Sequence, residues 1–414
     1  ETVRTVWSRY ERSGERGRCL CQARGITMFD PNELPDLKAA IREATVRDRR
    51  LLDDLRLEIR ALAVEVRAIK PRSTTSVSLV ASDGGNNKLV FDPFHVQLVR
   101  VVDSYGEQLC LDAVTPTTDT DVLSRAQFND DGSPRTALGR VMADLNVTPR
   151  TLNRLSHMIP DGKKVRESPD EVSLSWVLVY RDLCEWAALY ERICYRTFAT
   201  DTLLVRDGLL RSKLFRGELF IEFRKRIENA IEKIRKETRR KVFLVGLAKH
   251  SKVLARYNLA MALEGIFPHG SPRYVSVPRK LEAKAYVWPE YARGAEAEEG
   301  GGEAPKFVAG DMYFVRFGER SGDPLWTVDI LSSQTQQAAE VFGYLLADAI
   351  HGFPIPFYPR CLQKAHEFAE IVDFDLDILQ DEVIIAVRGL LNDKEIPALE
   401  ALRLQGDVSA RRYE

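Results

Sequence analysis

The sequence predicts a mixed α/β protein. Apolar runs with strand composition, at residues 77–81 and 202–205, each lead towards an Asp that is followed by Gly, a pattern typical of a buried strand that ends in a turn. Apolar residues at helical spacing mark long segments at residues 35–69, 174–198 and 214–241. Strands interleaved with helices of that length indicate a sheet covered by helices.

The length and charge of the chain limit the classes of protein to which it can belong. The 414 residues, 44% hydrophobic and 29% charged, suit one large elaborated domain or two. With 60 basic against 61 acidic residues the net charge is -1, so a nucleic-acid surface would have to be a local patch. No apolar run reaches the ~18–20 residues of a membrane span, and the N-terminus has no signal-peptide core. We expect a cytoplasmic protein without membrane contact.

The six cysteines are scattered along the chain, as expected for reduced thiols in a cytoplasmic protein. Cys19 and Cys21 have no second Cys or His pair nearby, so the sequence does not favour a zinc site there. The other four are Cys110, Cys184, Cys194 and Cys361.

The N-terminal part divides into two segments. Residues 1–27 are polar and rich in Arg, and we expect a poorly ordered segment, with a basic arm that touches DNA phosphate as the alternative. Residues 28–72 form an N-terminal helical segment, in which residues 35–69 are predicted to be one long helix that ends before Pro71. This helix either packs on a partner subunit or covers the sheet.

Three strands are predicted in quick succession as an antiparallel meander. The first carries Asp83 and ends in a hairpin-type turn at residues 84–87. The second covers residues 88–103 with a bend at Asp92, and the third covers residues 108–114.

Residues 116–172 are polar and turn-rich and interrupt the strands. Within them, residues 138–152 superficially resemble a helix-turn-helix motif, but an inserted pair of helices is the favoured interpretation, because short matches of this kind are common.

Acidic residues at strand ends are the strongest chemical signal. A carboxylate at the end of an apolar strand is costly to bury unless it is paired with a cation or metal. Asp83 and Asp207 both follow such strands, and two carboxylates at one sheet edge could converge on a hard divalent cation. A turn-initiating Asp bonded to backbone is the alternative for each. Glu185 and Glu191 lie in the apolar helix at residues 174–198, and each is a candidate third ligand.

The second half of the chain adds two further candidates. Lys249 follows a buried strand at residues 242–248 and could hold a phosphate or form a salt bridge. His366 lies in a helix that begins near Cys361 after a proline-rich approach, and a structural role competes with a catalytic one. The charged helix at residues 214–241 is mostly a solvated face, with phosphate contact as the alternative.

Strand composition returns at residues 312–317 and 325–331, after an acidic, Gly-rich loop at residues 290–306 that we expect to be flexible. The remainder, residues 381–414, is predicted to be a C-terminal strand or helix and a tail.

Together these pieces resemble the NurA nuclease family, whose members work with a HerA-type hexameric DNA translocase. The resemblance covers about residues 75–375, and its motifs occur in family order: Asp83 in SLVASDGG, Asp207 in LLVRDGLL, Lys249 in VGLAKHSK and His366 in FPIPFYPRCLQKAH. The acidic residue that the family carries on the intervening helix is assigned to Glu185 in YRDLCEWAAL, with Glu191 as the substitute.

The resemblance implies an RNase H-like mixed β-sheet flanked by helices, spanning residues 73–380. It implies a homodimer that acts with a HerA-like hexameric ATPase in DNA end processing, for repair or phage defence. The implied activity is 5′ to 3′ exonuclease and single-strand endonuclease cleavage of DNA, with Mn²⁺ or Mg²⁺ in a two-metal site. The segments at residues 116–172 and 294–304 look like additions to the family pattern.

In this scheme Asp83 is the central metal ligand, with Asp207 and Glu185 flanking it. His366 is a ligand or a proton-transfer group, and Lys249 neutralises the scissile phosphate. The alternatives are a non-catalytic DNA-binding or scaffold subunit of the translocase complex and a nuclease that acts on RNA.

Overall fold

The computed structural model describes residues 33–73, 77–91, 94–286 and 306–401. The chain divides into two compact units, residues 1–59 and 60–414. The predicted basic segment at residues 1–27 lies outside the described residues, as does nearly all of the acidic loop at residues 290–306. None of the described helices is long and apolar enough to cross a membrane.

The N-terminal unit confirms the predicted helix only in part. Two helices, α3 (Leu34–Arg47) and α4 (Arg49–Ile59), are separated at Asp48, whose backbone N–H caps α3. The predicted continuation to residue 69 is wrong. A 3-10 helix, η1 (Arg60–Glu65), and a short strand, β1 (Arg67–Ala68), follow instead. Both belong to the second unit, within which Arg67 and Ala68 pair with Tyr274 and Arg273 of its sheet.

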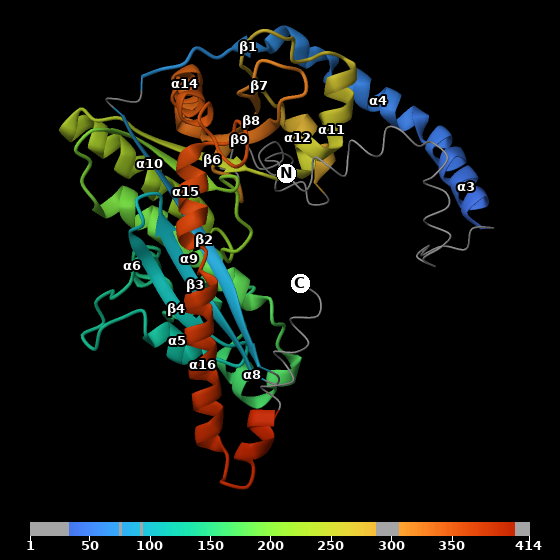
Figure 1. The fold of residues 1–414 in the computed structure, drawn as a ribbon. Coiled ribbons are helices and arrows are strands. Elements are labelled where there is room, and N and C mark those ends of the chain that lie inside the picture. Colours follow the sequence, from blue (N-terminus) through green and yellow to red (C-terminus); the bar gives the residue numbers. More distant parts are fainter. Residues whose placement is uncertain (1–32, 74–76, 92–93, 287–305, 402–414) are drawn as a thin grey trace. The chain divides into compact units, whose positions relative to one another are not determined.

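Within the described residues, the second unit is built on one mixed sheet of nine strands in the order β1-β7-β8-β9-β6-β5-β2-β3-β4 (Figure 1). The strands are β2 (Val77–Phe91), β3 (Phe94–Asp103), β4 (Gln108–Val114), β5 (Asp201–Asp207), β6 (Val242–Ala248), β7 (Arg273–Ser276), β8 (Gly310–Arg316) and β9 (Leu325–Leu331), besides β1. The pairs β2–β5 and β5–β6 are parallel and the others are antiparallel. An antiparallel meander extended by parallel strands confirms the predicted α/β class with a mixed sheet.

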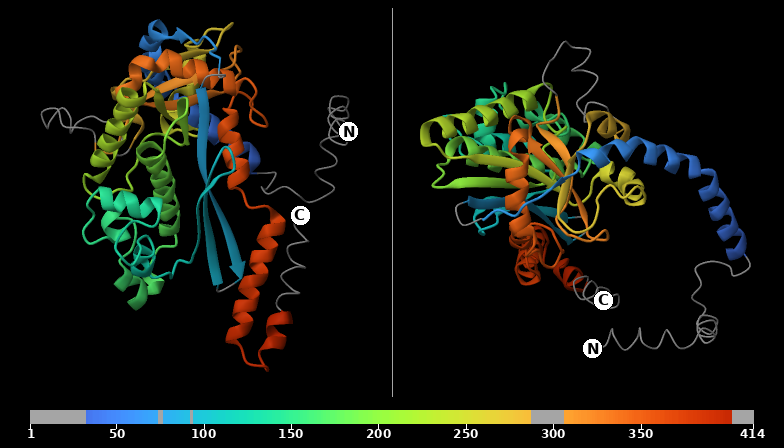
Figure 2. Two further views of the ribbon diagram at one scale, coloured as in Figure 1. Left: turned by 90° about the vertical axis from the view of Figure 1, so that its left-hand side faces the viewer. Right: turned by 90° about the horizontal axis from the view of Figure 1, so that it is seen from above.

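Helices cover both faces of this sheet (Figure 2). Helices α9 (Trp176–Tyr195) and α10 (Leu219–Thr238) pack on one face with Val80, and α14 (Ala338–Ala349) and α15 (Arg360–Ala369) pack on the other with Ala81. Because successive strand residues point to opposite faces, the nearly continuous apolar runs of the central strands supply both cores.

The predicted hairpin turn at residues 84–87 is wrong. Strand β2 continues to Phe91 and pairs with β3 through Gly84↔Val101 and Gly85↔Arg100, so residues 88–91 belong to β2, and Phe91 is paired with Phe94 of β3. The two glycines have a packing reason instead. A Cβ at Gly84 would lie 2.2 Å from Glu185 of α9, and a Cβ at Gly85 would meet the backbone of Ala369 of α15. Helices therefore approach the strand closely from both faces.

The inserted segment at residues 116–172 forms short helices. These are α5 (Thr120–Arg125), α6 (Ala137–Asp144), α7 (Leu152–Leu155), α8 (Gly162–Glu167) and η2 (Pro169–Glu171). Leu152 and Leu155, on the helix that would have to be exposed for DNA recognition, are fully buried in the core around α9. The segment is a packed helical insertion, as the favoured interpretation predicts.

The last part of the second unit contains α11 (Lys252–Leu263), α12 (Arg279–Ala285), η4 (Ser332–Gln337) and α16 (Asp373–Leu390). Helix α15 begins at Arg360, immediately after the proline-rich approach, and carries His366 as predicted. Helix α16 extends to Leu390, so a helix forms the beginning of residues 381–414, where the sequence left strand and helix open.

Candidate metal centre

Asp83 and Asp207 lie side by side on neighbouring parallel strands. The register pairs Ser82 of β2 with Arg206 of β5, so the next residue of each strand is an Asp at the same level. Ala81 and Val205, two residues earlier, both belong to the core under α14 and α15. Since the side chains alternate, both carboxylates point to that face of the sheet. Asp83 is 9% exposed and Asp207 is half-buried.

His366 joins Asp83 from above the sheet. Its Nδ1 lies 2.8 Å from Oδ2 of Asp83, while Oδ1 of the same carboxylate accepts the backbone N–H of Gly84 at 2.8 Å. The His366 side chain is 61% exposed, and its Nε2 makes no hydrogen bond within the described residues. In the neutral tautomer whose Nδ1–H donates to Asp83, Nε2 is a lone-pair donor that faces solvent.

Two side chains contact Asp207. Lys249, the residue after β6, places Nζ 3.1 Å from Oδ2, and the hydroxyl of Tyr358 donates to Oδ1 at 3.4 Å. Tyr358 is fully buried, and its ring packs on Trp326 at 4.9 Å between centroids. Burial raises the pKa of Tyr358, and the charges of Asp207 and Asp83 raise it further. The phenol therefore stays protonated and remains a hydrogen-bond donor.

Glu185 approaches the site from the opposite face of the sheet. It packs against the backbone of Gly84, and its two oxygens contact Arg181 at 3.3 Å and Arg206 at 3.5 Å. Arg206 also stacks on the ring of Trp186 at 4.4 Å. Burial raises the pKa of Glu185 to about 8, with the two arginines opposing that shift.

Glu191 lies elsewhere on α9. Its carboxylate pairs with Arg196 at 3.8 Å, and it lines a different cavity together with Cys110 of β4. Of the two acidic residues proposed for the helix, Glu185 is therefore the one beside the Asp83 strand.

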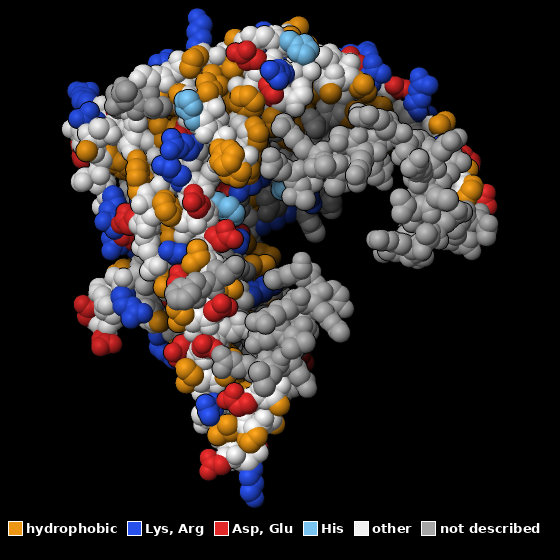
Figure 3. Space-filling model, in the orientation of Figure 1, with side chains coloured by type: hydrophobic (Ala, Val, Ile, Leu, Met, Phe, Trp, Pro, Cys, Tyr) orange, Lys and Arg blue, Asp and Glu red, His pale blue; other side chains and the backbone are white. Residues whose placement is uncertain are grey.

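A cavity of about 550 Å³ is lined by Lys249, Tyr358 and His366, the side chains that contact the two Asp residues. Basic or imidazole side chains in its lining are those of Lys249, His351, Arg360, Lys364 and His366, against the carboxylates of Glu367 and Glu370. Figure 3 shows the face around α15, where acidic, basic and histidine side chains lie together. The cavity has the charge and size to receive an anionic group of a larger ligand.

The donor set at this edge suits a hard divalent cation. Carboxylate oxygens and an imidazole nitrogen are ligands that Mn²⁺ and Mg²⁺ accept, and Asp83, Asp207 and His366 supply them from one face. Glu185 differs, because both of its oxygens are already held by arginines. Its assignment as a flanking ligand stays a prediction.

The sequence did not identify Tyr358, Arg181 or Arg206 as parts of this site. Tyr358 lies inside the FPIPFYPR segment that was interpreted only as a stiff approach to a helix. Arg206 precedes Asp207, so strand alternation alone places it on the α9 face. That signal was present in the sequence. The contact of Arg181 with Glu185 follows the i,i+4 spacing of a helix.

No protein-family model matches the sequence, and no curated protein matches it. Solved structures that are similar to this chain include crystal structures of NurA proteins. At these identities and TM-scores the likeness concerns fold alone.

The first of these is the crystal structure of the NurA nuclease from Sulfolobus solfataricus, with 12% identity over 86% of this chain and 98% of that chain and a TM-score of 0.38. A second NurA crystal structure shows 14% identity over 84% and 98% of the two chains, with a TM-score of 0.37. A third, NurA bound to dAMP and manganese, shows 13% identity over 81% and 94%, with a TM-score of 0.34.

Proposed function

We propose that this protein is a metal-dependent nuclease that hydrolyses phosphodiester bonds in DNA. The observation that supports it is the register of β2 and β5, which sets Asp83 and Asp207 side by side under His366 and Lys249. Two adjacent carboxylates, an imidazole and an ammonium group beside an open cavity are the groups that phosphodiester hydrolysis needs.

Asp83 and Asp207 would hold Mn²⁺, or Mg²⁺, in a site of one or two ions, with His366 as the nitrogen donor or proton acceptor. A divalent ion bound there supplies an activated water and neutralises charge on the leaving oxygen. Lys249 contributes a positive charge to the scissile phosphate. Asp83 orients the imidazole of His366 so that Nε2 accepts a proton from water or returns it to the leaving group. Tyr358 holds the Asp207 carboxylate in place.

The cavity next to the two Asp residues is proposed to receive the DNA strand. Arg360 and Lys364 would contact backbone phosphates, and Phe353, which is 84% exposed in the cavity lining, offers a ring for base stacking. Stacking requires an unpaired base, which supports the preference for single strands and strand ends. The proposal includes 5′ to 3′ exonuclease and single-strand endonuclease activity, as the motif resemblance implies.

Two alternative functions predict different results in a DNA-cleavage assay. A non-catalytic DNA-binding or scaffold subunit would bind DNA without cleaving it, and an RNA-directed nuclease would favour RNA. The contact of His366 with Asp83 and the adjacent positions of Asp83 and Asp207 on paired strands support a catalytic site over a scaffold.

The test is incubation of the full chain with linear duplex DNA, single-stranded DNA and RNA of one sequence in Mn²⁺, Mg²⁺ and EDTA. We expect DNA degradation with Mn²⁺ and none with EDTA or with Asp83→Asn. Asp375→Asn, which removes an exposed carboxylate of α16, should leave the rate unchanged. Cleavage by Asp83→Asn at the parent rate would contradict the proposal, and faster degradation of RNA would favour the RNA alternative.

We also propose a homodimer that docks on a HerA-like hexameric ATPase. Support comes from α3 and α4, where no residue of α3 is buried and Ile41, Val46 and Leu57 are exposed. Sedimentation of the full chain should give twice the 47.0 kDa of one chain. A monomer at micromolar concentration would remove the dimer, and a soluble HerA-like hexamer that fails to co-sediment with the chain would remove the second part.

A further inference from the structure

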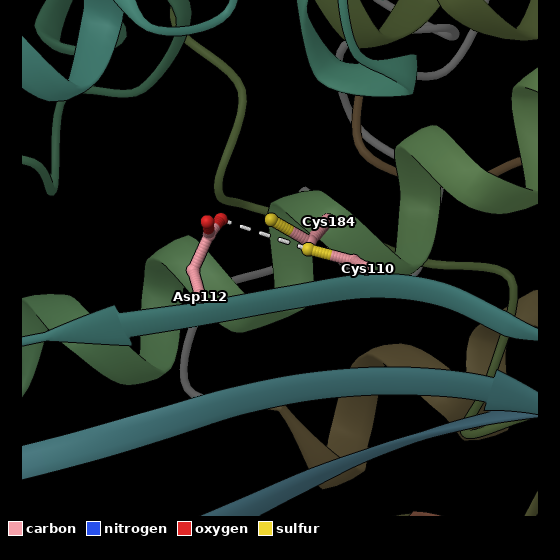
Figure 4. Close-up of side chains that lie close together, drawn as sticks. All are labelled: Cys110, Asp112 and Cys184. Atoms are coloured by element: carbon pink, nitrogen blue, oxygen red, sulfur yellow. Dashed lines mark hydrogen bonds between the residues drawn. The ribbon is translucent and has the colours of Figure 1, made fainter.

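A second cluster of metal-ligating side chains lies on the α9 face of the sheet, between β4 and α9 (Figure 4). Cys110 and Asp112 are two residues apart on β4 and so point to the same face, and Cys184 reaches them from α9. Their three ligand atoms lie within 4.8 Å of one another, and among the described residues no other set of three or more His, Cys, Asp or Glu meets that criterion.

The Asp112 carboxylate is held in place for ligation. Its Oδ2 accepts the hydroxyl of Tyr180 at 2.7 Å and the thiol of Cys110 at 3.7 Å, and the side-chain amide of Gln127 donates to the Tyr180 hydroxyl at 3.3 Å. Within the described residues, Oδ1 of Asp112 accepts no hydrogen bond. A ligand oxygen that is oriented by an outer hydrogen bond is typical of metal sites in proteins.

A cavity of about 360 Å³ reaches this cluster. Cys110, Asp112 and Cys184 all line it, so an ion and a fourth, exogenous ligand have room to enter. Cys184 is buried and Cys110 is half-buried, so the two sulfurs sit at the inner end of an accessible space. Cys361 differs, because its thiol is buried and interacts with Asp348.

We propose that Cys110, Asp112 and Cys184 bind a thiophilic divalent cation, with Zn²⁺ as the preferred ion. The fourth coordination position of the ion is open to the cavity. Two thiolates and one carboxylate with a water form a tetrahedral set that Zn²⁺ accepts, whereas Mn²⁺ and Mg²⁺ prefer oxygen ligands. Binding forms two Zn–S bonds and one Zn–O bond, and the two thiol protons pass to solvent.

The site would cross-link β4 to α9 and so restrain the helix that carries Glu185, the residue after Cys184. The two neighbours point in different directions, since Cys184 faces β4 and Glu185 faces Gly84. The inference stands on the cysteine cluster alone and does not depend on the proposed nuclease activity.

The experiment is a Co²⁺ titration of the full chain, fully reduced with a phosphine and stripped of metal. The Cys19→Ser/Cys21→Ser background removes the other closely spaced thiols from the measurement. We expect a sulfur-to-cobalt charge-transfer band that saturates at one thiolate-bound Co²⁺ per chain and that Zn²⁺ abolishes by displacement. Cys110→Ser and Cys184→Ser should each remove the band, and Tyr180→Phe should weaken the affinity by ~10–100-fold.

The matched control is Cys194→Ser, which removes another thiol of α9 outside the cluster and should leave the titration unchanged. Because Cys110 is only half-buried, the Cys110→Ser variant should fold. It therefore tests the metal site even if Cys184→Ser fails to fold. Absence of the band in the reduced parent, or its persistence in Cys110→Ser, would overturn the inference. A Cys110–Cys184 disulfide before reduction, with no cobalt bound after it, would assign the pair to a redox link instead.

Discussion

Substitution of Gly84 by Ala tests how closely α9 approaches the Asp83 strand. The new Cβ would lie 2.2 Å from Oε1 of Glu185 and 2.9 Å from its Cδ, so the carboxyl group has to move by more than 1 Å to restore ordinary contact. That movement strains its contacts with Arg181 and Arg206. Overpacking of this kind costs ~1–3 kcal/mol, and we expect a loss of that size in the free energy of unfolding.

The assay is chemical denaturation followed by tryptophan fluorescence, in the parent and in a Glu185→Ala background. Because Glu185→Ala removes the atoms that the methyl group meets, Gly84→Ala should cost less than ~0.5 kcal/mol there, which gives a coupling energy of ~0.5 kcal/mol or more. Gly389→Ala serves as the control, since its Cβ meets nothing within 4 Å and the change should stabilise α16 by up to ~1 kcal/mol. An equal cost of Gly84→Ala in both backgrounds would refute the packing argument.

Three further predictions concern buried charges and hydrogen bonds. The pKa of Glu185 in the folded protein is raised to about 8 from 4.5. The stability that its protonation contributes is therefore complete below pH 4.5 and is lost as the pH rises through 8. In urea denaturation across this pH range, the free energy of unfolding of Glu185→Gln should fall less with rising pH than that of the parent. Tyr358→Phe keeps the ring on Trp326 but loses the hydrogen bond to Asp207, and DNA cleavage should fall by ~2–10-fold with the melting temperature nearly unchanged. Asp329→Asn loosens the fully buried contacts of Asp329 with Arg211, and we expect a loss of ~3–5 kcal/mol in unfolding free energy. Asp323→Asn, at a half-buried Asp whose carboxylate accepts only the backbone N–H of Arg320 within the described residues, should cost far less.

Local pattern predicted most of the central sheet and the helices that flank it. The runs before Asp83 and Asp207 are long, apolar and bounded by turn residues, and they form β2 and β5. The pairing of these strands was not available from sequence, because the side-by-side arrangement depends on the register Ser82↔Arg206. Convergence of the two carboxylates was therefore a hypothesis until the register was known.

The glycines show where local pattern misleads. Gly84 and Gly85 have the composition of a turn, but tertiary packing keeps them in an extended strand between Glu185 and Ala369. In the same way, a helical pattern continues past Ile59, but pairing of Arg67 with Tyr274 draws the chain into the sheet. In both places long-range contacts override local preference, which no window of sequence records.

The role of His366 was predicted from its place in the chain, and its contact with Asp83 at 2.8 Å makes the prediction testable at atomic level. His366→Ala should reduce turnover by ~10²–10⁴-fold while stability is kept. His351→Ala is a matched control in the lining of the same cavity and should have a smaller effect. A shift of half-maximal activity to higher Mn²⁺ would identify a ligand, and a changed pH profile at saturating metal would identify a proton-transfer group. Near-parental cleavage by His366→Ala would show that it is a packing residue.

The most direct test of the proposed site measures Mn²⁺ binding and DNA cleavage together. Both are measured on the same preparations of the parent, Asp83→Asn and Asp207→Asn. Binding is followed by the loss of the free Mn²⁺ paramagnetic resonance signal and cleavage by the release of labelled nucleotides from single-stranded DNA. The site described above predicts that each substitution weakens Mn²⁺ binding and lowers the cleavage rate in parallel. Parental binding and parental cleavage in both folded variants would contradict it.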